Sequence, residues 1–459
     1  MFRFLCFLLL AAVTVGAQQP PIYASDSPID GFGPQLQRSR NFIVVLHSPF
    51  LIYPPASDPN QTMPAAPADP LPPQFSTRRP GQHRRGTPVR FTPTIQRVYL
   101  QERLGALLDE TRHLGHAYSI EEFVGFSASF TSGELSHLLR GDDENTISFV
   151  EEDRVVHLHD EVVEITAAAR SWGQDRVDQR TLPLSATYDL PRINGTAYSG
   201  SGVTVFVIDT GLAAHQECPA PRCRQVANFA GDGIARDCQG HGSHVAGTVA
   251  GGTTGIAPGA QVAAVKVLNC EGSGSWSSIL AGMNYAASNK PPGAAVASMS
   301  LGGPYSQSIN TATNNLAKVM VTMVAAGNEN QDARNTSPAS ATSANVLTVA
   351  STTSSDTRSS FSNWGPAVDV LAPGSAIRSA NPCASGSSCS CSTCYSSWSG
   401  TSMATPHVAG AAAVFLQWKP NWTASQIASY LRCAATPNRI SGLPSQTGTC
   451  LPPALVFFF

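Results

Sequence analysis

Three side chains that together could attack a carbonyl group are spread along this chain. Asp209 follows the apolar run 203–208, His241 lies between two glycines, and Ser402 precedes an Ala-rich apolar run. An imidazole can take the proton of a serine hydroxyl, and a carboxylate can hold that imidazole in the required orientation. These residue types therefore predict a serine nucleophile, with His241 as its base and Asp209 as the partner of the base.

Ser402 also has a simpler interpretation. A serine ahead of an apolar run can cap the first turn of a helix. At that position its hydroxyl is exposed, and its backbone N–H lies at the positive end of the helix dipole, which also suits a nucleophile. The presence of Asp209 and His241 upstream favours the nucleophile over a mere cap. The order Asp, His, Ser is one of the three chain orders in which this triad occurs.

Asn328 is a candidate for stabilising the negative charge that such an attack creates. Its side-chain amide could donate to the oxyanion together with the backbone N–H of Ser402. The alternative is a turn residue in a Gly-Asn pair, but its place after a buried run and two alanines favours the functional role. His244 and His407 are expected to be structural, and His215 is expected at the surface.

These residues require a sheet whose strand ends meet at one edge. Apolar runs alternate with helical stretches, which is typical of a parallel sheet with helices on both faces. The expected helices start near His241, Ser275, Ser308 and Ser402, and sites in such folds lie at the carboxyl edge of the sheet. The expected strands are 203–208, 262–267, 294–299, 319–325 and 346–349.

Composition and the first residues indicate export. The 459 residues carry a net charge of −2 and only 13% charged residues, so there is no electrostatic case for binding nucleic acid or an anionic membrane. Residues 1–17 combine Arg3, an apolar core and a small-residue cleavage site, as in a secretory signal. The apolar core is far shorter than the roughly 20 residues of a membrane span. We therefore expect a secreted protein.

A second, smaller unit is expected between the signal and the triad-bearing domain. Strands at 41–46, 124–130 and 147–150 and helices around Leu104 and after Ser132 suggest a small α+β domain over residues 18–169. Residues 48–94 hold twelve of the 34 prolines and read as an inserted loop. The larger domain is expected at 170–440, followed by a tail at 441–459.

Several sequence blocks resemble the subtilase family of serine proteases, and within it the proteinase K-like branch with its animal convertases. The resemblance covers roughly Trp172 to Leu431. Its blocks are Val207–Gly211, Gly240–Thr248, Val265–Leu268, Ser300–Gly303, Ala325–Asn328, Ser360–Asn363 and Gly400–Gly410. It implies a subtilisin-like fold and a serine endopeptidase that acts on polypeptides. It also implies that residues 18–169 are a propeptide, which acts as an intramolecular inhibitor and is removed by self-cleavage, here expected between Thr166 and Ser171.

The resemblance also implies how a peptide is held. Two backbone segments, Gly272-Ser273-Gly274 and Ser300-Leu301-Gly302, would sandwich an extended substrate, in a mode that reads main chain more than side chains. Ala325, Ala326 and Gly327 would form one wall of the pocket for the residue before the cut. Because these side chains are small and uncharged, we expect broad cleavage after apolar or aromatic residues. We expect a monomer.

The ten cysteines that remain after the signal fit an oxidising compartment. The resemblance to animal convertases pairs Cys238 with Cys270 and Cys391 with Cys394. Proximity suggests two further pairs, Cys218–Cys223 and Cys433–Cys450. A zinc site remains the alternative for one Cys-rich stretch, because closely spaced thiols can hold that metal; its thiols are Cys383, Cys389, Cys391 and Cys394.

No cofactor is expected for the chemistry itself. The resemblance implies a structural calcium site with Asp369 as its carboxylate ligand and backbone carbonyls from the loop between Ser340 and Thr348. That loop is two residues longer here, which puts the site in question. Four sequons, at Asn60, Asn194, Asn335 and Asn421, allow glycosylation of an exported chain.

Two functions remain open from the sequence. The first is an active secreted endopeptidase made as a self-processed zymogen. The second is a self-cleaved binding protein whose propeptide stays docked and blocks turnover. The complete set Asp209, His241, Asn328 and Ser402 favours the first.

Overall fold

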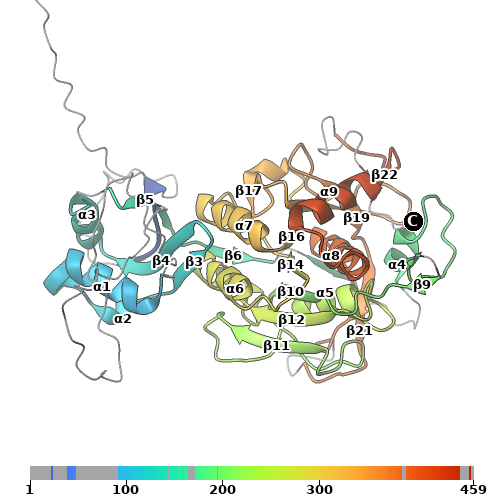
Figure 1. The fold of residues 1–459 in the computed structure, drawn as a ribbon, viewed down its shortest axis with the longest axis horizontal. Helices are drawn as coiled ribbons and strands as arrows, with labels where there is room; N and C mark the ends of the chain where they lie inside the picture. Colours follow the sequence, from blue (N-terminus) through green and yellow to red (C-terminus); the bar gives the residue numbers. More distant parts are fainter. Residues whose placement is uncertain are drawn as a thin grey trace, which may run out of the picture.

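The computed structural model describes residues 22–23, 39–47, 91–142, 145–158, 160–163, 171–193, 195–384, 389–444 and 454–455. They form a small N-terminal unit and a larger C-terminal unit that lie side by side (Figure 1). The expected signal at 1–17 and most of the proline-rich stretch 48–94 lie outside the described residues. Among the described helices, none has the length and apolar character needed to cross a bilayer.

The N-terminal unit is a sheet covered by helices. Its central strands β2 (Arg40–Leu46), β4 (Phe123–Phe130) and β5 (Ile147–Glu152) match the three expected strands, and β3 (Ala117–Ile120) adds a hairpin partner to β4. The sheet order is β1-β5-β2-β4-β3, where β1 is Ile22–Tyr23. With helices α1 (Pro93–Leu104) and α3 (Ser132–Arg140), β2, β3, β4 and β5 follow one another in a β-α-β-β-α-β order.

Local signals start and stop these helices. α1 has Pro93 at its first turn and is capped by Thr92, so it begins one residue before the predicted end of the insertion. α3 is capped by Thr131 rather than by Ser132, because Thr131 and Glu134 form a reciprocal capping box. Two short helices, η2 (Gly105–Leu107) and α2 (Glu110–His113), follow α1. Leu107, the last residue of η2, is exposed.

The larger unit is built on a twisted sheet with the order β11-β12-β10-β14-β16-β18-β19-β23-β22. Every pairing from β11 through β23 is parallel, and β22 pairs antiparallel with β23. The strands are β10 (Thr204–Asp209), β11 (Cys223–Asn228), β12 (Gln261–Lys266), β14 (Ala295–Met299), β16 (Val321–Ala325), β18 (Val346–Thr352), β19 (Val370–Pro373), β22 (Thr436–Pro437) and β23 (Ala454–Leu455).

Helices cover both faces of this sheet, as expected. α5 (His241–Ala250) and α8 (Thr401–Trp418) pack on one face, and α6 (Trp276–Ser288) and α7 (Gln307–Val319) pack on the other (Figure 1). α9 (Ala424–Ala434) packs against α8. The central strands are buried on both faces, which explains their nearly continuous apolar runs. The predicted strand 319–325 is shorter in the structure because α7 extends to Val319.

The remaining elements are short. They are β6 (Val155–His157), β7 (Glu161–Val163), α4 (Trp172–Val177), β8 (Arg192–Ile193), β9 (Thr196–Ala197), β13 (Ser273–Ser275), β15 (Gly303–Pro304), η3 (Ala333–Asn335), β17 (Thr336–Ser337), β20 (Ile377–Ala380) and β21 (Tyr395–Ser399). Several of them line the edge of the sheet where the candidate residues lie.

The N-terminal unit docks on the starts of α6 and α7. The Asp153 carboxylate accepts hydrogen bonds from the backbone N–H and the hydroxyl of Ser277, at 2.9 and 2.6 Å. The Glu151 carboxylate accepts one from the backbone N–H of Ser308 at 2.8 Å. Negative charge is favourable at a helix N-terminus, so both acids hold this unit against the larger one.

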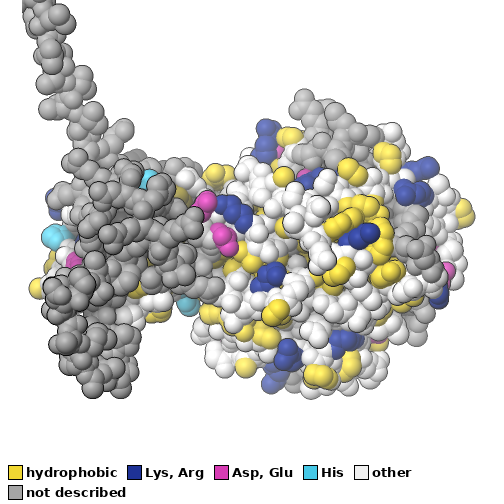
Figure 2. Space-filling view, viewed as in Figure 1, with side chains coloured by type: hydrophobic (Ala, Val, Ile, Leu, Met, Phe, Trp, Pro, Cys, Tyr) yellow, Lys and Arg dark blue, Asp and Glu magenta, His cyan; other side chains and the backbone are white. Residues whose placement is uncertain are grey.

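The surface reflects the composition. The visible face of the larger unit is mostly uncharged, with scattered basic and few acidic side chains (Figure 2). Two of the four sequon asparagines, Asn335 and Asn421, are exposed, and the other two lie outside the described residues.

Candidate active site

Asp209 and His241 meet at the carboxyl edge of the sheet. Asp209 is the last residue of β10, and His241 is the first residue of α5. Oδ1 of Asp209 lies 2.7 Å from Nδ1 of His241, and both side chains are fully buried. A buried carboxylate at Nδ1 places a proton on that nitrogen and directs Nε2 toward the cleft.

A second carboxylate, Asp237, fixes the start of α5. Its Oδ1 accepts from the backbone N–H groups of Gln239 and Gly240, and its Oδ2 accepts from the backbone N–H and hydroxyl of Ser243. The hydroxyl of Thr210 also donates to Oδ1 at 2.9 Å. Because Thr210 follows Asp209 directly, this network holds His241 and Asp209 in register. Sequence reasoning did not identify Asp237.

Ser402 lies at the start of α8, but it is not the cap. The helix begins at Thr401 with Gly400 as its cap, so Ser402 is the second helical residue. Its backbone N–H is therefore one of the first N–H groups that have no partner inside the helix. The Ser402 hydroxyl donates to the carbonyl of Ser300 at 3.2 Å, and the Ser300 hydroxyl donates to the carbonyl of Ser402 at 2.8 Å. Ser300 thus lies beside the predicted nucleophile.

The Asn328 side chain is held in one orientation. Its carbonyl Oδ1 accepts from the backbone N–H of Thr401 at 2.8 Å and from the Thr401 hydroxyl at 2.9 Å. The amide Nδ2 is thereby directed into the site, as an oxyanion donor requires. There it donates to Oδ1 of Asp160 at 2.7 Å.

Asp160 comes from the N-terminal unit, and sequence reasoning missed it. Its Oδ2 lies 2.6 Å from Nε2 of His241, and its side chain is only 3% exposed. The Asp209–His241 contact of the predicted triad is therefore formed. Nε2 of His241, however, contacts Asp160, and the Ser402 hydroxyl donates to the carbonyl of Ser300. A weak indication of Asp160 in the sequence was the acid-rich segment that follows β5.

Burial and neighbouring charges set the protonation of the histidines. Burial by itself would lower the pKa of His241, but the charges and hydrogen bonds of Asp209 and Asp160 outweigh burial and raise it to about 10. Burial lowers the pKa of His244 to about 3 and that of His407 to about 4. His244 and His407 are therefore neutral and structural, as expected. His215 is buried, contrary to expectation, and its Nε2 lies 2.8 Å from the carbonyl of Cys394.

One of the two expected peptide-binding segments lines a pocket, and the other pairs with the N-terminal unit. Strand β13 contains Ser273 and Gly274, and it pairs antiparallel with β6 of the N-terminal unit. Leu301, Gly302, Ala325 and Gly327 line the adjoining pocket, whereas Ala326 is fully buried in the core. The other lining residues are His157, Leu158, Gly303, Asn328, Glu329, Thr336, Ser337, Thr401 and Ser402.

Glu329 is an acid in a pocket that was expected to have none. Its Oε2 accepts a hydrogen bond from Nδ2 of Asn363 at 2.7 Å, which ties the carboxylate to the wall behind Gly327. The other described residues that line the pocket include no Asp or Glu. Its acidity is therefore confined to one side chain.

Disulfides account for eight cysteines. The structure contains Cys238–Cys270, Cys391–Cys394 and Cys218–Cys223, as expected, and Cys383–Cys389, which had no assigned partner. The zinc alternative is wrong, because its four sulfurs form two of these bonds. Cys450, the suggested partner of Cys433, lies outside the described residues.

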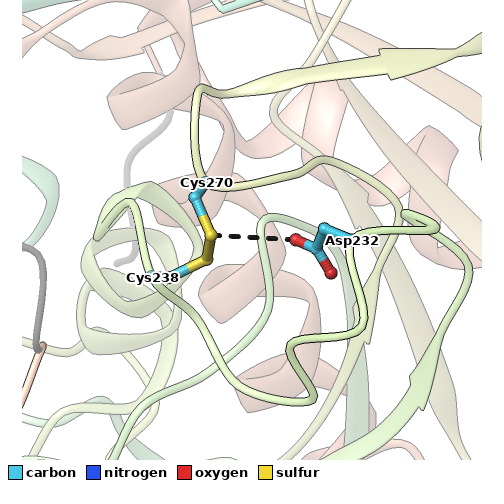
Figure 3. A group of neighbouring side chains, drawn as sticks. All are labelled: Asp232, Cys238 and Cys270. Carbon is cyan, nitrogen blue, oxygen red and sulfur yellow. Dashed lines mark hydrogen bonds between the residues drawn. A yellow bond between two sulfur atoms is a disulfide. The ribbon is translucent and has the colours of Figure 1, made fainter.

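A cluster of Asp232, Cys238 and Cys270 has metal-like spacing, but it is not a metal site. Figure 3 shows the two sulfurs joined in a disulfide, with the Asp232 carboxylate beside them. Asp232 pairs instead with the buried Lys266, whose Nζ lies 3.0 Å away. Lys266 also donates to the carbonyls of Thr210 and Leu268, which joins the loops after β10 and β12.

The residues around Asp369 do not fit the expected calcium site, because the side chain of Arg432 occupies that position. Nε of Arg432 donates to Oδ1 of Asp369 at 2.8 Å. The two terminal nitrogens of Arg432 donate to the carbonyls of Ala344 and Val346, at 2.7 and 2.6 Å. Those carbonyls belong to the loop that was expected to supply calcium ligands. A guanidinium thus makes the contacts predicted for the metal ion.

Replacing Arg432 by serine should lower the melting temperature. The loss of charge-assisted hydrogen bonds costs about 1–3 kcal/mol, and each kcal/mol shifts the melting temperature of a domain of this size by about 2–4 °C. The variant should also gain a calcium response larger than that of the wild type, because Asp369 and the two carbonyls become available.

Calorimetry with calcium and with chelator measures both effects. In the double variant Arg432→Ser, Asp369→Asn, the additional calcium response should disappear. An Arg432→Ser protein whose response equals that of the wild type would contradict this assignment.

The chain is similar to known sequences and structures. The Subtilase family profile matches residues 200–449. An extracellular serine proteinase of Thermus sp. (strain Rt41A) is 46% identical over 296 residues, which are 64% of this chain and 67% of the relative. An alkaline serine exoprotease A of Vibrio alginolyticus is 42% identical over 321 residues, or 69% of this chain and 56% of the relative.

Two further comparisons cover most of the other protein. A cuticle-degrading protease of Metarhizium anisopliae is 38% identical over 374 residues, 78% of this chain and 87% of the relative. The crystal structure of a cold adapted subtilisin-like serine proteinase superposes with a TM-score of 0.56 and 42% identity, covering 63% of this chain and 98% of that one. The resemblance first drawn from short motifs therefore extends over 63% to 78% of this chain.

Proposed function

The chain belongs to the subtilase family of serine endopeptidases, and from this premise we propose that it is secreted as a self-processed zymogen that cleaves polypeptides with a Ser-His-Asp triad. The main support is the buried contact of 2.7 Å between Asp209 and His241, together with the position of Ser402 in the first turn of α8. The extracellular relatives support secretion.

Each residue has a role in the proposed reaction. Ser402 Oγ attacks the scissile carbonyl, and His241 takes its proton and passes it to the leaving amine. Asp209 holds the imidazole and stabilises its charged form. Nδ2 of Asn328 and the backbone N–H of Ser402 stabilise the oxyanion. The fixed orientation of the Asn328 amide supports that role.

The zymogen part of the proposal assigns residues 18–169 to an inhibitory propeptide. Its docking through Asp153 and Glu151, and the pairing of β6 with β13 in the cleft, support this assignment. The expected cut between Thr166 and Ser171 lies almost wholly outside the described residues. N-terminal sequencing of the secreted protein tests it, and an intact precursor would contradict self-processing.

Substrates with Phe or Leu before the cut should be cleaved faster than those with Arg. Burying a large apolar side chain contributes about 1.5–3 kcal/mol, so we expect a ratio of about tenfold or more in kcat/KM. A matched series of peptide amides measures this ratio, and a preference for Arg would contradict the proposal.

Replacing Glu329 tests whether this acid causes the residual cleavage after Arg. It is the acid among the pocket-lining residues, so Glu329→Gln should lower kcat/KM for Arg peptides and leave Phe and Leu peptides almost unchanged. An equal loss on all peptides would show that Glu329 only supports the wall through Asn363.

The second hypothesis, a self-cleaved binder with a permanently docked propeptide, gains no support from the comparisons. The relatives named above are all called proteases or proteinases. Turnover by the purified protein separates the two hypotheses.

A further inference from the structure

We propose that Asp160 is a built-in brake on the precursor: its carboxylate engages the base and the oxyanion donor at once, and the precursor becomes reactive only when that carboxylate leaves. This inference rests on the proposed function, because it takes His241 and Asn328 to be parts of the reaction machinery. It concerns a single side chain and goes beyond inhibition by a docked propeptide in general.

The chain crosses the site at Asp160, with a strand on each side. Before the site, β6 pairs antiparallel with β13, and the backbone N–H of Leu158 donates to the carbonyl of Gly272 at 3.0 Å. After the site, β7 pairs antiparallel with β21, which leads into α8. Both flanking segments are therefore held by backbone ladders, and the residue between them is placed against His241.

The Asp160 carboxylate occupies the space that a reacting carbonyl would need. One oxygen lies 2.6 Å from Nε2 of His241, and the other accepts from Nδ2 of Asn328 at 2.7 Å. It also packs against Gly400, at a point where any side chain on residue 400 would collide with it. A peptide carbonyl poised for attack has to contact the same amide of Asn328.

This arrangement disables the proposed chemistry in two ways. The carboxylate stabilises a charged His241, and a charged imidazole cannot accept the proton of Ser402. The Ser402 hydroxyl is meanwhile directed to the carbonyl of Ser300. The raised pKa of His241 agrees with this geometry. The Asp160 side chain therefore contacts His241 and Asn328 directly, in addition to the backbone pairing that docks the neighbouring strands.

The first test measures how long the full-length precursor survives. Asp160→Asn keeps the shape and removes the charge, and Asp160→Ala removes the whole group. Both should shorten the half-life of the intact precursor at neutral pH by about tenfold, since hydrogen bonds between charged groups are lost. The matched control Glu152→Gln removes a charge from the same unit, where Glu152 pairs with the exposed Arg40, and it should process like the wild type.

The second test does not depend on cleavage. In precursors that carry Ser402→Ala, the ring N–H signals of His241 report its protonation by NMR. Asp160→Asn should move the titration of His241 to lower pH, and thermal unfolding shows whether the fold is kept. Asp160 variants that survive as long as the wild type, or an unchanged His241 titration, would overturn the brake.

Failure of the brake can be told from failure of the proposed function. If all precursors are cut at the wild-type rate, the brake is wrong and the protease remains. If none is cut and none reacts with a fluorophosphonate, the proposed function is wrong, and the His241 titration still decides whether Asp160 controls that residue.

Discussion

Ser402→Ala is expected to leave the precursor uncut and to lower kcat on peptide substrates by about 10⁶-fold, since loss of the nucleophile removes the whole cooperating unit. Gel electrophoresis of the secreted chain and initial rates after cleavage at an engineered site measure the two effects. The residual rate comes from the oxyanion donors and binding alone.

Ser308 offers a closely matched control for this change. Like Ser402, it is a buried serine at the second position of its helix. Ser308→Ala should therefore process and turn over like the wild type. A Ser402→Ala protein that keeps more than a small fraction of the activity, or a Ser308→Ala protein that loses as much, would show that the effect is structural.

Asp209→Asn is expected to lower kcat by about 10⁴-fold. The amide would donate to Nδ1 of His241, which places the imidazole proton on Nε2 and leaves no base toward Ser402. Because the charge of Asp209 raises the pKa of His241, its loss also lowers that pKa. Activity requires neutral His241, so the rise of the residual rate with pH should move to lower pH.

Rates measured across pH on the processed enzyme test both parts of this prediction. Asp332→Asn is a suitable control, because Asp332 pairs with the exposed Arg334 and is not among the residues that line the pocket, and it should change kcat little. A change in KM with kcat preserved in Asp209→Asn would place Asp209 in substrate binding instead.

The sheet could be predicted because its strands and helices carry strong local patterns. The runs at 205–208 and 295–297 are apolar throughout, since parallel strands are buried on both faces. The short strands β6 and β7 could not be predicted in this way, because their hydrogen-bond partners, β13 and β21, come from distant parts of the chain. Ser402 was expected near a helix start, but whether Gly400, Thr401 or Ser402 caps α8 depends on local geometry.

The site residues that lie in sequence motifs could be predicted. The residues that contact them only because of the tertiary fold could not. Asp209, His241 and Asn328 lie in such motifs. Asp160 lies outside them, and only docking of the N-terminal unit brings it to His241. Arg432 is an ordinary residue of α9 in the sequence, so its contact with Asp369 could not be foreseen, and the calcium expectation failed at that position.

Whether Ser402 is a working nucleophile can be measured with a fluorophosphonate probe on the purified secreted protein, alongside a gel that shows whether the propeptide co-purifies. We expect that Ser402 carries the probe in the wild type, that Ser402→Ala does not react, and that labelled protein lacks the propeptide. An unlabelled Ser402 together with a stoichiometric propeptide would contradict this expectation.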